Sequence, residues 1–156
     1  MLEAYASAPD AFTSTVSERA ALPLEWWQKR VANSPDAAEI VYGAFDDDVL
    51  VGAAGLSFER RERTRHKATL FGMYVRPAMR GRGMGRRLVE HVLLHARDTE
   101  PIELVQLTVS ASNADAVALY ERCGFASFGA EPMAVKTDDG YITKIHMWRR
   151  LDANAR

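Results

Sequence analysis

The sequence predicts one α/β domain with a mixed, mostly antiparallel, twisted sheet flanked by helices. Three observations support this. The spacing of apolar residues changes from helical to strand-like near Glu39. Two pairs of strand candidates are joined by the turn signals Asp46-Asp47-Asp48 and Asp138-Asp139-Gly140, which indicates antiparallel hairpins. Between these pairs, a strand candidate leads through a glycine-rich segment into an amphipathic helix. With 156 residues, 47% of them hydrophobic, the chain suits a single domain over residues 1–156.

The first 34 residues predict three helices. A short helix over residues 4–8 precedes a second one, which Asp10 is expected to cap and which runs to about Ala21. A third helix begins at Pro23 and ends at Asn33-Ser34-Pro35. Its apolar face consists of Leu24, Trp27 and Val31, so Trp27 is expected in the core.

The next segment predicts three strands. Residues 39–45 and 49–58 form the first hairpin. The run from Arg60 to Lys67 is too polar to bury and is expected to be a loop, and a third strand covers residues 68–75.

The second half predicts two helices and three strands. A helix follows the glycines, stops at residues 98–101 and carries the apolar stripe Val89, Val92, Leu93 and Ala96. A strand over residues 102–110 leads to a second helix, which Ser112 or Asn113 caps and Gly124 ends, with an apolar face of Ala116, Leu119, Tyr120 and Cys123. Residues 125–129 and 141–150 are the last two strands, separated by a loop over residues 131–140.

Charge and cysteine content narrow the class of protein. A net charge of −1 argues against binding nucleic acid or a membrane through bulk charge. The single cysteine excludes an intrachain disulfide and a multi-cysteine metal site. We expect no metal. No apolar run is long enough to span a bilayer, and the N-terminus has an acidic residue where a signal peptide has basic ones, so a cytoplasmic location is expected.

The segment from Arg80 to Arg87 combines three glycines with arginines at a strand-to-helix junction. Glycine permits φ > 0, and the first N–H groups of a helix attract anions, so this segment predicts a phosphate site. An ATP-binding loop would need Lys and Ser or Thr after the last glycine, where the chain has Arg86-Arg87. A dinucleotide fold does not suit the antiparallel hairpins. A tight turn with solvated arginines stays open as an alternative.

Two stretches resemble the GNAT superfamily of N-acetyltransferases. Residues 73–85, with Arg80-x-x-Gly83-x-Gly85 at their end, resemble the acetyl-CoA loop of that family. Residues 107–125, which contain Asn113, Tyr120 and Gly124-Phe125, resemble its next motif. The resemblance covers about residues 68–130, and implies the GNAT fold, with acetyl-CoA as co-substrate and a primary amine as acceptor. The first strand of that fold is short or missing here, because Leu2-Glu3-Ala4 already resembles its first helix.

The resemblance also implies site residues. The strand before the loop splays from its neighbour, so that Met73 and Val75 offer backbone groups to the cofactor and the Met73 N–H stabilises the oxyanion. Residues 81–86 hold the pyrophosphate. Asn113 has a second interpretation as a helix cap. The implied cofactor-binding residues are Met73, Tyr74, Val75, Arg80, Gly81, Arg82, Gly83, Met84, Gly85, Arg86, Asn113 and Tyr120.

Tyr120 has two interpretations. A phenol on a short amphipathic helix is by default a core residue, but the resemblance makes Tyr120 the general acid that protonates the leaving thiolate. We favour the second. Cys123 is interpreted as a small core residue, because direct transfer needs no nucleophile.

The general base and the acceptor stay open. The histone-acetylating and ribosomal-protein branches carry their base where this chain has Thr69 and Thr108, neither of which can accept the proton. Glu59, His66, Glu103 or a water chain are the alternatives. We expect a small or amino-acid-like amine, bound by Phe12, Trp26 or Trp27 and the loop over residues 131–140. A protein acceptor, a CoA-binding module without activity and a nucleic-acid-binding protein are the competing hypotheses, and a homodimer could cover an exposed sheet edge.

Overall fold

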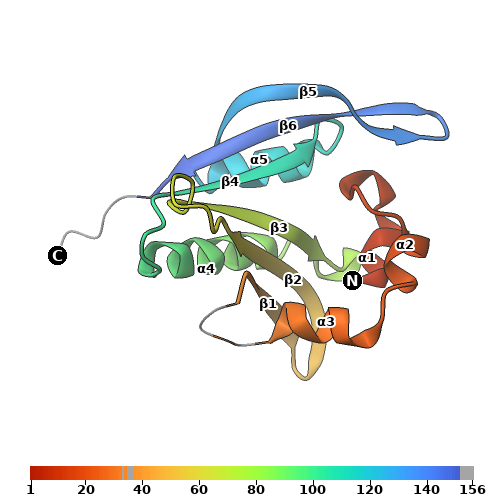
Figure 1. Cartoon of the computed structure of the whole chain (residues 1–156). Helices are drawn as coiled ribbons and strands as arrows, with labels where there is room; N and C mark the ends of the chain where they lie inside the picture. Colours follow the sequence, from red (N-terminus) through yellow and green to blue (C-terminus); the bar gives the residue numbers. More distant parts are fainter. Residues whose placement is uncertain (33, 35–36, 152–156) are drawn as a thin grey trace.

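A six-stranded sheet forms the centre of the molecule (Figure 1). The computed structural model describes residues 1–32, 34 and 37–151. The strands, in spatial order, are β1 (Glu39–Asp46), β2 (Val49–Phe58), β3 (Lys67–Val75), β4 (Leu104–Ser110), β6 (Gly140–Arg150) and β5 (Ala126–Thr137). Only β3 and β4 pair in parallel, and the other neighbours are antiparallel. The predicted mixed, mostly antiparallel sheet is therefore confirmed.

Helices flank this sheet on both faces. They are α1 (Leu2–Ser7), α2 (Val16–Ala20), α3 (Leu24–Val31), α4 (Met84–Asp98) and α5 (Ala114–Arg122), with short 3₁₀ turns η1 (Pro9–Ala11) and η2 (Pro77–Met79). Figure 1 shows α1 and α2 near the end of β3 and α3 beside β1, while α4 runs along the sheet. In the part of the chain that the structure describes, no helix is both long and apolar enough to cross a membrane.

The hydrophobic core lies between the sheet and the helices α4 and α5. Alternate residues of β3 and β4 point into it, as the two-residue period of a strand requires, among them Leu70, Val105 and Leu107. The predicted stripe of α4 is confirmed, because each of its four residues is at most 2% exposed: Val89, Val92, Leu93 and Ala96. Burying each of the larger side chains contributes about 1.5–3 kcal/mol to the free energy of unfolding.

The predicted strands are confirmed with one change at the C-terminal hairpin. Residues 131–137, expected as a loop, continue strand β5 as far as Thr137. Pairing with β6 is irregular between Glu131 and Val135, and Met133 has a φ of 57°. That irregularity explains why a regular strand pattern was not visible in the sequence. The turn itself is confined to Asp138 and Asp139.

The second helix begins later than predicted. Asp10 lies in the turn η1 and caps nothing, and Phe12 is extended. The cap is Thr15, whose side chain accepts a hydrogen bond from the Glu18 N–H, while Glu18 bonds back to the Thr15 N–H. This reciprocal capping box satisfies two N–H groups at once, so it outcompetes the single bond that Asp10 offers.

The apolar face predicted for α3 is wrong. Leu24 and Val31 are 69% and 67% exposed, and Trp27 is only half-buried, so it is not a core residue. Helix α3 packs beside β1 at the edge of the sheet instead of over the core. Its predicted stop falls on Asn33 and Pro35, which lie outside the described residues.

No described residue before Glu39 lies in a strand, and the chain enters α1 at Leu2. This arrangement matches the short or missing first strand that was predicted as a departure of this sequence from the family pattern. Strand β1 is therefore the edge of the sheet on this side.

The C-terminus of α5 fixes the position of Tyr120. Gly124 has a φ of 82°, the Phe125 N–H donates to the Tyr120 carbonyl (3.0 Å), and the Gly124 N–H donates to the Glu121 carbonyl (2.9 Å). These bonds form a Schellman motif, whose usual hydrophobic contact is here made by the rings of Tyr120 and Phe125, 5.9 Å apart. The glycine thus holds one helix end and one aromatic pair together.

Replacing Gly124 with Ala should therefore destabilise the protein. A left-handed conformation costs a residue with Cβ about 1–2 kcal/mol, which should appear as a lower free energy of unfolding in urea denaturation. Gly129→Ala is the matched control, because Gly129 lies in β5 without a positive φ and an added Cβ there meets no atom within 4 Å. Equal stability of the Gly124 variant and the parent protein would contradict this role of the glycine.

Candidate active site

Strands β3 and β4 separate soon after they begin. Their parallel pairing involves only Lys67, Ala68 and Thr69 of β3, which lie opposite Leu104, Val105 and Gln106. Strand β4 stays paired with β6 along its whole length. The second half of β3 therefore has a backbone edge without a strand partner on the β4 side, and the two strands diverge in Figure 1. This separation confirms the splay that the resemblance implied.

A β-bulge lies on the separated part of β3. Phe71 pairs with Gly55 and Tyr74 with Ala53, so Gly72 and Met73 together oppose one residue of β2. Gly72 adopts a φ of 62°, as a bulge of this type requires. Among the described strands, Met73 has no paired residue on either side. Met73 therefore lies on the part of β3 that borders the gap between the separated strands.

The glycine segment leads from β3 into α4. Gly81 and Gly83 have φ values of 74° and 75°, and a Cβ on either would meet no atom within 4 Å. Gly83 is the N-cap of α4 and makes no side-chain cap, so the first N–H groups of the helix are left for an anion. Glycine at position 85 is explained by close packing instead, because a Cβ there would lie 3.1 Å from Met73 Cε and 3.3 Å from Leu119 Cδ2.

A cavity of about 940 Å³ fills the space between the separated strands. Its volume is within the range of about 300–1,000 Å³ that is typical of ligand sites. The predicted residues that line it are Met73, Tyr74, Val75, Arg80, Gly81, Gly83, Met84, Gly85, Arg86, Asn113 and Tyr120. Arg82 is not among its lining residues. The structure thus brings both sequence motifs to one cavity.

Two arginines of this segment make defined bonds. Arg80 Nε donates to the Val75 carbonyl (2.9 Å), and its guanidinium lies 5.8 Å from the centre of the Tyr74 ring. Arg86 Nε lies 2.7 Å from Glu90 Oε1, and this bond raises the pKa of Arg86. Arg80 therefore binds the last carbonyl of β3, while the charged Arg86 lines the cavity.

Asn113 caps α5 and also lines the cavity. Its Oδ1 accepts a hydrogen bond from the Ala116 N–H (3.2 Å). The cap interpretation is therefore confirmed, and the position of the side chain leaves room for a ligand contact as well.

Tyr120 is buried yet lines the cavity. It is 6% exposed, and burial raises the pKa of its phenol, so the hydroxyl keeps its proton at neutral pH. The Cys123 thiol is 4% exposed, and burial raises its pKa too. Because a nucleophilic cysteine needs a lowered pKa, Cys123 is a core residue, as predicted.

The N-terminal helices form the other wall. Ser7 Oγ and the Tyr74 hydroxyl lie 2.9 Å apart, and Arg76 makes bidentate contacts of 2.7–3.1 Å with the Glu3 carboxylate, which lower the pKa of Glu3. The Ser110 hydroxyl donates to the Asp10 carbonyl. Of the aromatic residues expected here, Phe12 and Trp27 line the cavity and Trp26 does not.

Three basic side chains on this wall were not predicted from the sequence: Arg19, Arg30 and Lys144. Arg30 pairs with Glu39 at 3.0 Å, and Lys144 Nζ donates to Thr13 Oγ1 while burial lowers the pKa of Lys144. These residues come from α2, α3 and β6, and no local pattern in the sequence links them.

None of the three candidate bases lines the cavity. The carbonyl of His66 accepts a hydrogen bond from the Glu103 N–H (2.8 Å) where β3 and β4 begin, at the opposite end from the glycine segment. Nearby, the Glu59 backbone N–H donates to the Lys67 carbonyl (3.3 Å). Thr69 and Thr108 do line the cavity. Asp115, in the first turn of α5, is the one carboxylate among its described lining residues.

Comparison with known families decides the assignment. The model of the acetyltransferase (GNAT) family matches residues 1–125. The chain belongs to the GNAT family of acetyltransferases. The enzyme class predicted from the sequence, an acyltransferase, is thereby confirmed.

Relatives of this GNAT protein have different acceptors in their names. It is 28% identical over 123 residues to the L-amino acid N-acetyltransferase AaaT of Escherichia coli K12, which covers 79% of this chain and 74% of that protein. It is 48% identical over 59 residues to the ribosomal protein bS18-alanine N-acetyltransferase of Salmonella typhimurium LT2, covering 38% of this chain and 39% of that one. The acetyltransferase yncA of Salmonella typhimurium, solved with its cofactor acetyl-CoA, shares the fold, with a TM-score of 0.77, 21% identity and coverage of 99% and 88% of the two chains.

The buried phenol of Tyr120 should make the protein less stable in alkali. Below a pH of about 10 both the folded and unfolded states keep this proton, so pH has no effect through this group. Above it the unfolded chain releases the proton first, and the free energy of unfolding should fall by about 1.4 kcal/mol per pH unit until the raised folded pKa is reached. Urea denaturation at several alkaline pH values measures this slope.

In Tyr120→Phe the free energy of unfolding should fall less steeply with rising pH, because this variant has no phenol at position 120. Tyr141→Phe is the matched control, because it removes the same hydroxyl from a tyrosine that is 54% exposed. Equal slopes for Tyr120→Phe and the parent protein would show that the phenol titrates normally in the folded state.

Proposed function

We propose that this GNAT protein transfers the acetyl group of acetyl-CoA to the primary amine of a small, amino-acid-like molecule, by direct attack within a ternary complex. One observation carries the proposal. The cavity joins an unpaired strand edge, an uncapped helix N-terminus and a buried, protonated tyrosine. Each of these three features matches one part of a thioester donor.

The residues present fit acetyl-CoA. The open space beside Gly81 and Gly83, the N–H groups of the first turn of α4 and the charge of Arg86 suit its pyrophosphate. The unpaired edge of β3 at Met73 suits the amides of its pantetheine arm as an added strand. Asn113 remains available for a further contact from its place beside the cavity.

The chain would assist the reaction at two atoms of the thioester, the carbonyl oxygen and the sulfur. The amine nitrogen bonds to the thioester carbon and the carbon–sulfur bond breaks. The Met73 N–H, free of strand pairing, would stabilise the negative charge that develops on the carbonyl oxygen. The Tyr120 hydroxyl would give its proton to the departing thiolate, and its raised pKa keeps that proton in place until then.

The proton of the acceptor ammonium would be transferred to water in the cavity. An ammonium must lose a proton before it can attack, and Asp115 at the α5 end is the one carboxylate among the described residues of the cavity wall. Transfer through water molecules in the cavity, one of the alternatives from the sequence, therefore suits this wall better than Glu59, His66 or Glu103.

A small acceptor is favoured over a protein. The similarity to the amino acid N-acetyltransferase AaaT extends over 79% of the chain, whereas that to the ribosomal-protein enzyme covers 38%. The cavity is also covered on the acceptor side by α1, α2 and α3, which suits a small molecule more than an extended peptide. Pairing of two copies at β1 and a cytoplasmic location stay predictions.

A thiol-release assay tests the proposal. The protein is incubated with acetyl-CoA and single amines from four groups, namely amino acids, polyamines, aminoglycosides and peptide N-termini, and free CoA is measured with a thiol reagent. We expect release with amino acids and little with the other groups. Binding of acetyl-CoA without release for any amine would instead support a CoA-binding module.

Tyr120→Phe should lower turnover without loosening the donor. The variant keeps the ring contact with Phe125 and loses only the proton donor. We expect kcat at saturating acetyl-CoA to fall by about a hundredfold or more, with the dissociation constant of acetyl-CoA little changed. Tyr141→Phe should retain full turnover. An unchanged kcat in Tyr120→Phe would remove Tyr120 as the acid.

A further inference from the structure

Arg19 lines the cavity with a charge that no carboxylate among the described residues balances. We propose that Arg19 binds a carboxylate of the acceptor, which makes the acceptor an amino acid with a free carboxyl group. This inference rests on the proposed function and specifies its substrate class and the residue that selects it.

The cavity wall is strongly basic. Its described lining residues include one carboxylate, Asp115, and six cationic side chains: Arg19, Arg30, Arg80, Arg86, Arg122 and Lys144. Arg80, Arg86 and Arg122 belong to the glycine segment and α5, the end that suits the phosphates of the donor. The charge on the other wall has no such explanation.

Three cations remain among the described residues of the acceptor wall. Arg30 has its ion pair with Glu39 at 3.0 Å. Lys144 donates to Thr13, and burial lowers its pKa. Within the described part of the chain, Arg19 makes neither an ion pair nor a side-chain hydrogen bond, and its Nε is buried without an acceptor.

Aromatic rings hold the Arg19 guanidinium in place. Its central carbon lies 4.8 Å from the centre of the Trp26 ring and 5.7 Å from that of Tyr5. Attraction of a guanidinium to aromatic rings does not use up its N–H groups as hydrogen-bond donors. A carboxylate can accept two parallel bonds from the terminal N–H groups of a guanidinium.

The position of the side chain matters as much as the missing partner. Arg97 on α4 also has a buried Nε without an acceptor, but it does not line the cavity. An unsatisfied Nε alone is therefore not evidence of a site. Arg19 combines it with a place on the cavity wall.

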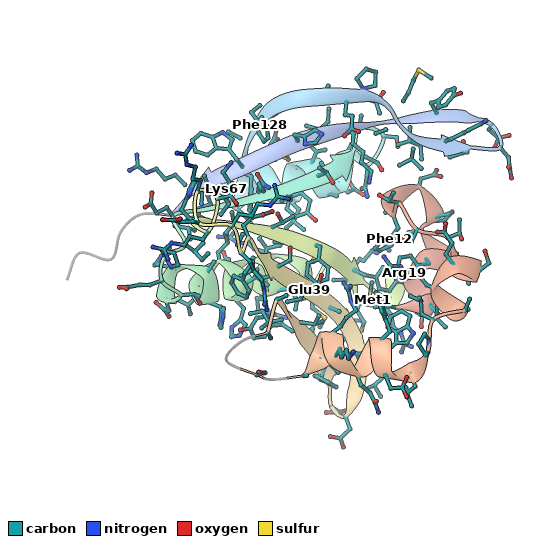
Figure 2. The ribbon with its side chains drawn as sticks, viewed as in Figure 1. Met1, Phe12, Arg19, Glu39, Lys67 and Phe128 are labelled. Carbon is teal, nitrogen blue, oxygen red and sulfur yellow. The ribbon has the colours of Figure 1, made fainter. Side chains whose placement is uncertain are left out.

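A row of stacked side chains connects Arg19 with the bulge of β3. Trp26 lies between Arg19 and Arg30, and the Arg30 guanidinium is 4.5 Å from the Trp26 ring and 4.8 Å from the Phe71 ring. Phe71 directly precedes Gly72 and Met73. Figure 2 shows Arg19, Phe12 and Met1 close to the end of β3, with Lys67 and Phe128 at the far side. An acceptor whose carboxylate binds Arg19 would therefore have its carboxylate and its reacting amine in the same cavity.

A basic wall also excludes other amines. Polyamines and aminoglycosides carry several positive charges and no carboxylate, so they would meet repulsion from Arg19 without a compensating bond. An α-amino acid carries the anion that this wall needs and the amine that the reaction needs.

The test compares L-amino acids with their carboxamides, which keep the side chain and amine but lose the negative charge. For the parent protein we expect kcat/KM to be about tenfold to a hundredfold higher for the acid, since a hydrogen bond to a charged group contributes on this scale. In Arg19→Gln this preference should disappear through a higher KM for the acid, and the carboxamide should be used as before. Arg19→Lys should keep part of the preference.

Arg97→Lys is the matched control, because it removes a buried Nε outside the cavity and should leave both substrates unaffected. Thermal unfolding and the acetyl-CoA dissociation constant report whether each variant is folded. The comparison of acid with carboxamide in the unaltered protein needs no variant, so the proposal stays testable if Arg19→Gln does not fold. Equal use of acid and carboxamide, or preferred use of a polyamine or a peptide, would overturn it. No transfer to any amine would instead overturn the proposed function.

Discussion

The short parallel contact between β3 and β4 determines the rest of the structure. Strand β6 pairs with one edge of β4 along its whole length, while β3 pairs with the other edge only as far as Thr69 and Gln106, where the two strands diverge. A sheet normally closes such a gap, because unpaired backbone groups are costly when buried. Here the gap is kept open, the glycine segment and α4 border it at one end, and α1, α2 and α3 cover the other. The ligand cavity is thus a consequence of strand pairing, and side chains only shape it.

Glycines adapt the backbone to this gap in different ways. Gly72 forms the bulge that frees Met73, Gly81 and Gly83 hold the positive φ values of the loop, and Gly85 lets α4 approach β3 and α5. Gly124 plays a structural part in the same site, because the cap it forms sets the Tyr120 ring against Phe125. The proposed acid is therefore positioned by a helix end that is stable without any ligand.

The sequence predicted the elements with strong local signals. The stripe of α4, both hairpin turns, the Asn113 cap and Gly124 each follow from residue type and spacing, and all of them are confirmed. The errors arose where tertiary packing decides. Leu24 and Val31 have helical spacing but face solvent, because α3 lies at the sheet edge. Arg19, Arg30 and Lys144 converge from three separate elements, so no spacing rule could group them.

The capping of α2 and the placement of α3 have a consequence for divergence among related enzymes. Neither helix contains a buried residue; α2 contacts α1, and α3 is joined to β1 by the Arg30–Glu39 pair. Substitutions in these helices therefore leave the core of α4, α5 and the sheet intact. The proposed acceptor wall can evolve at little cost to the fold, while the proposed donor side, built into the core and the glycine segment, is far more constrained.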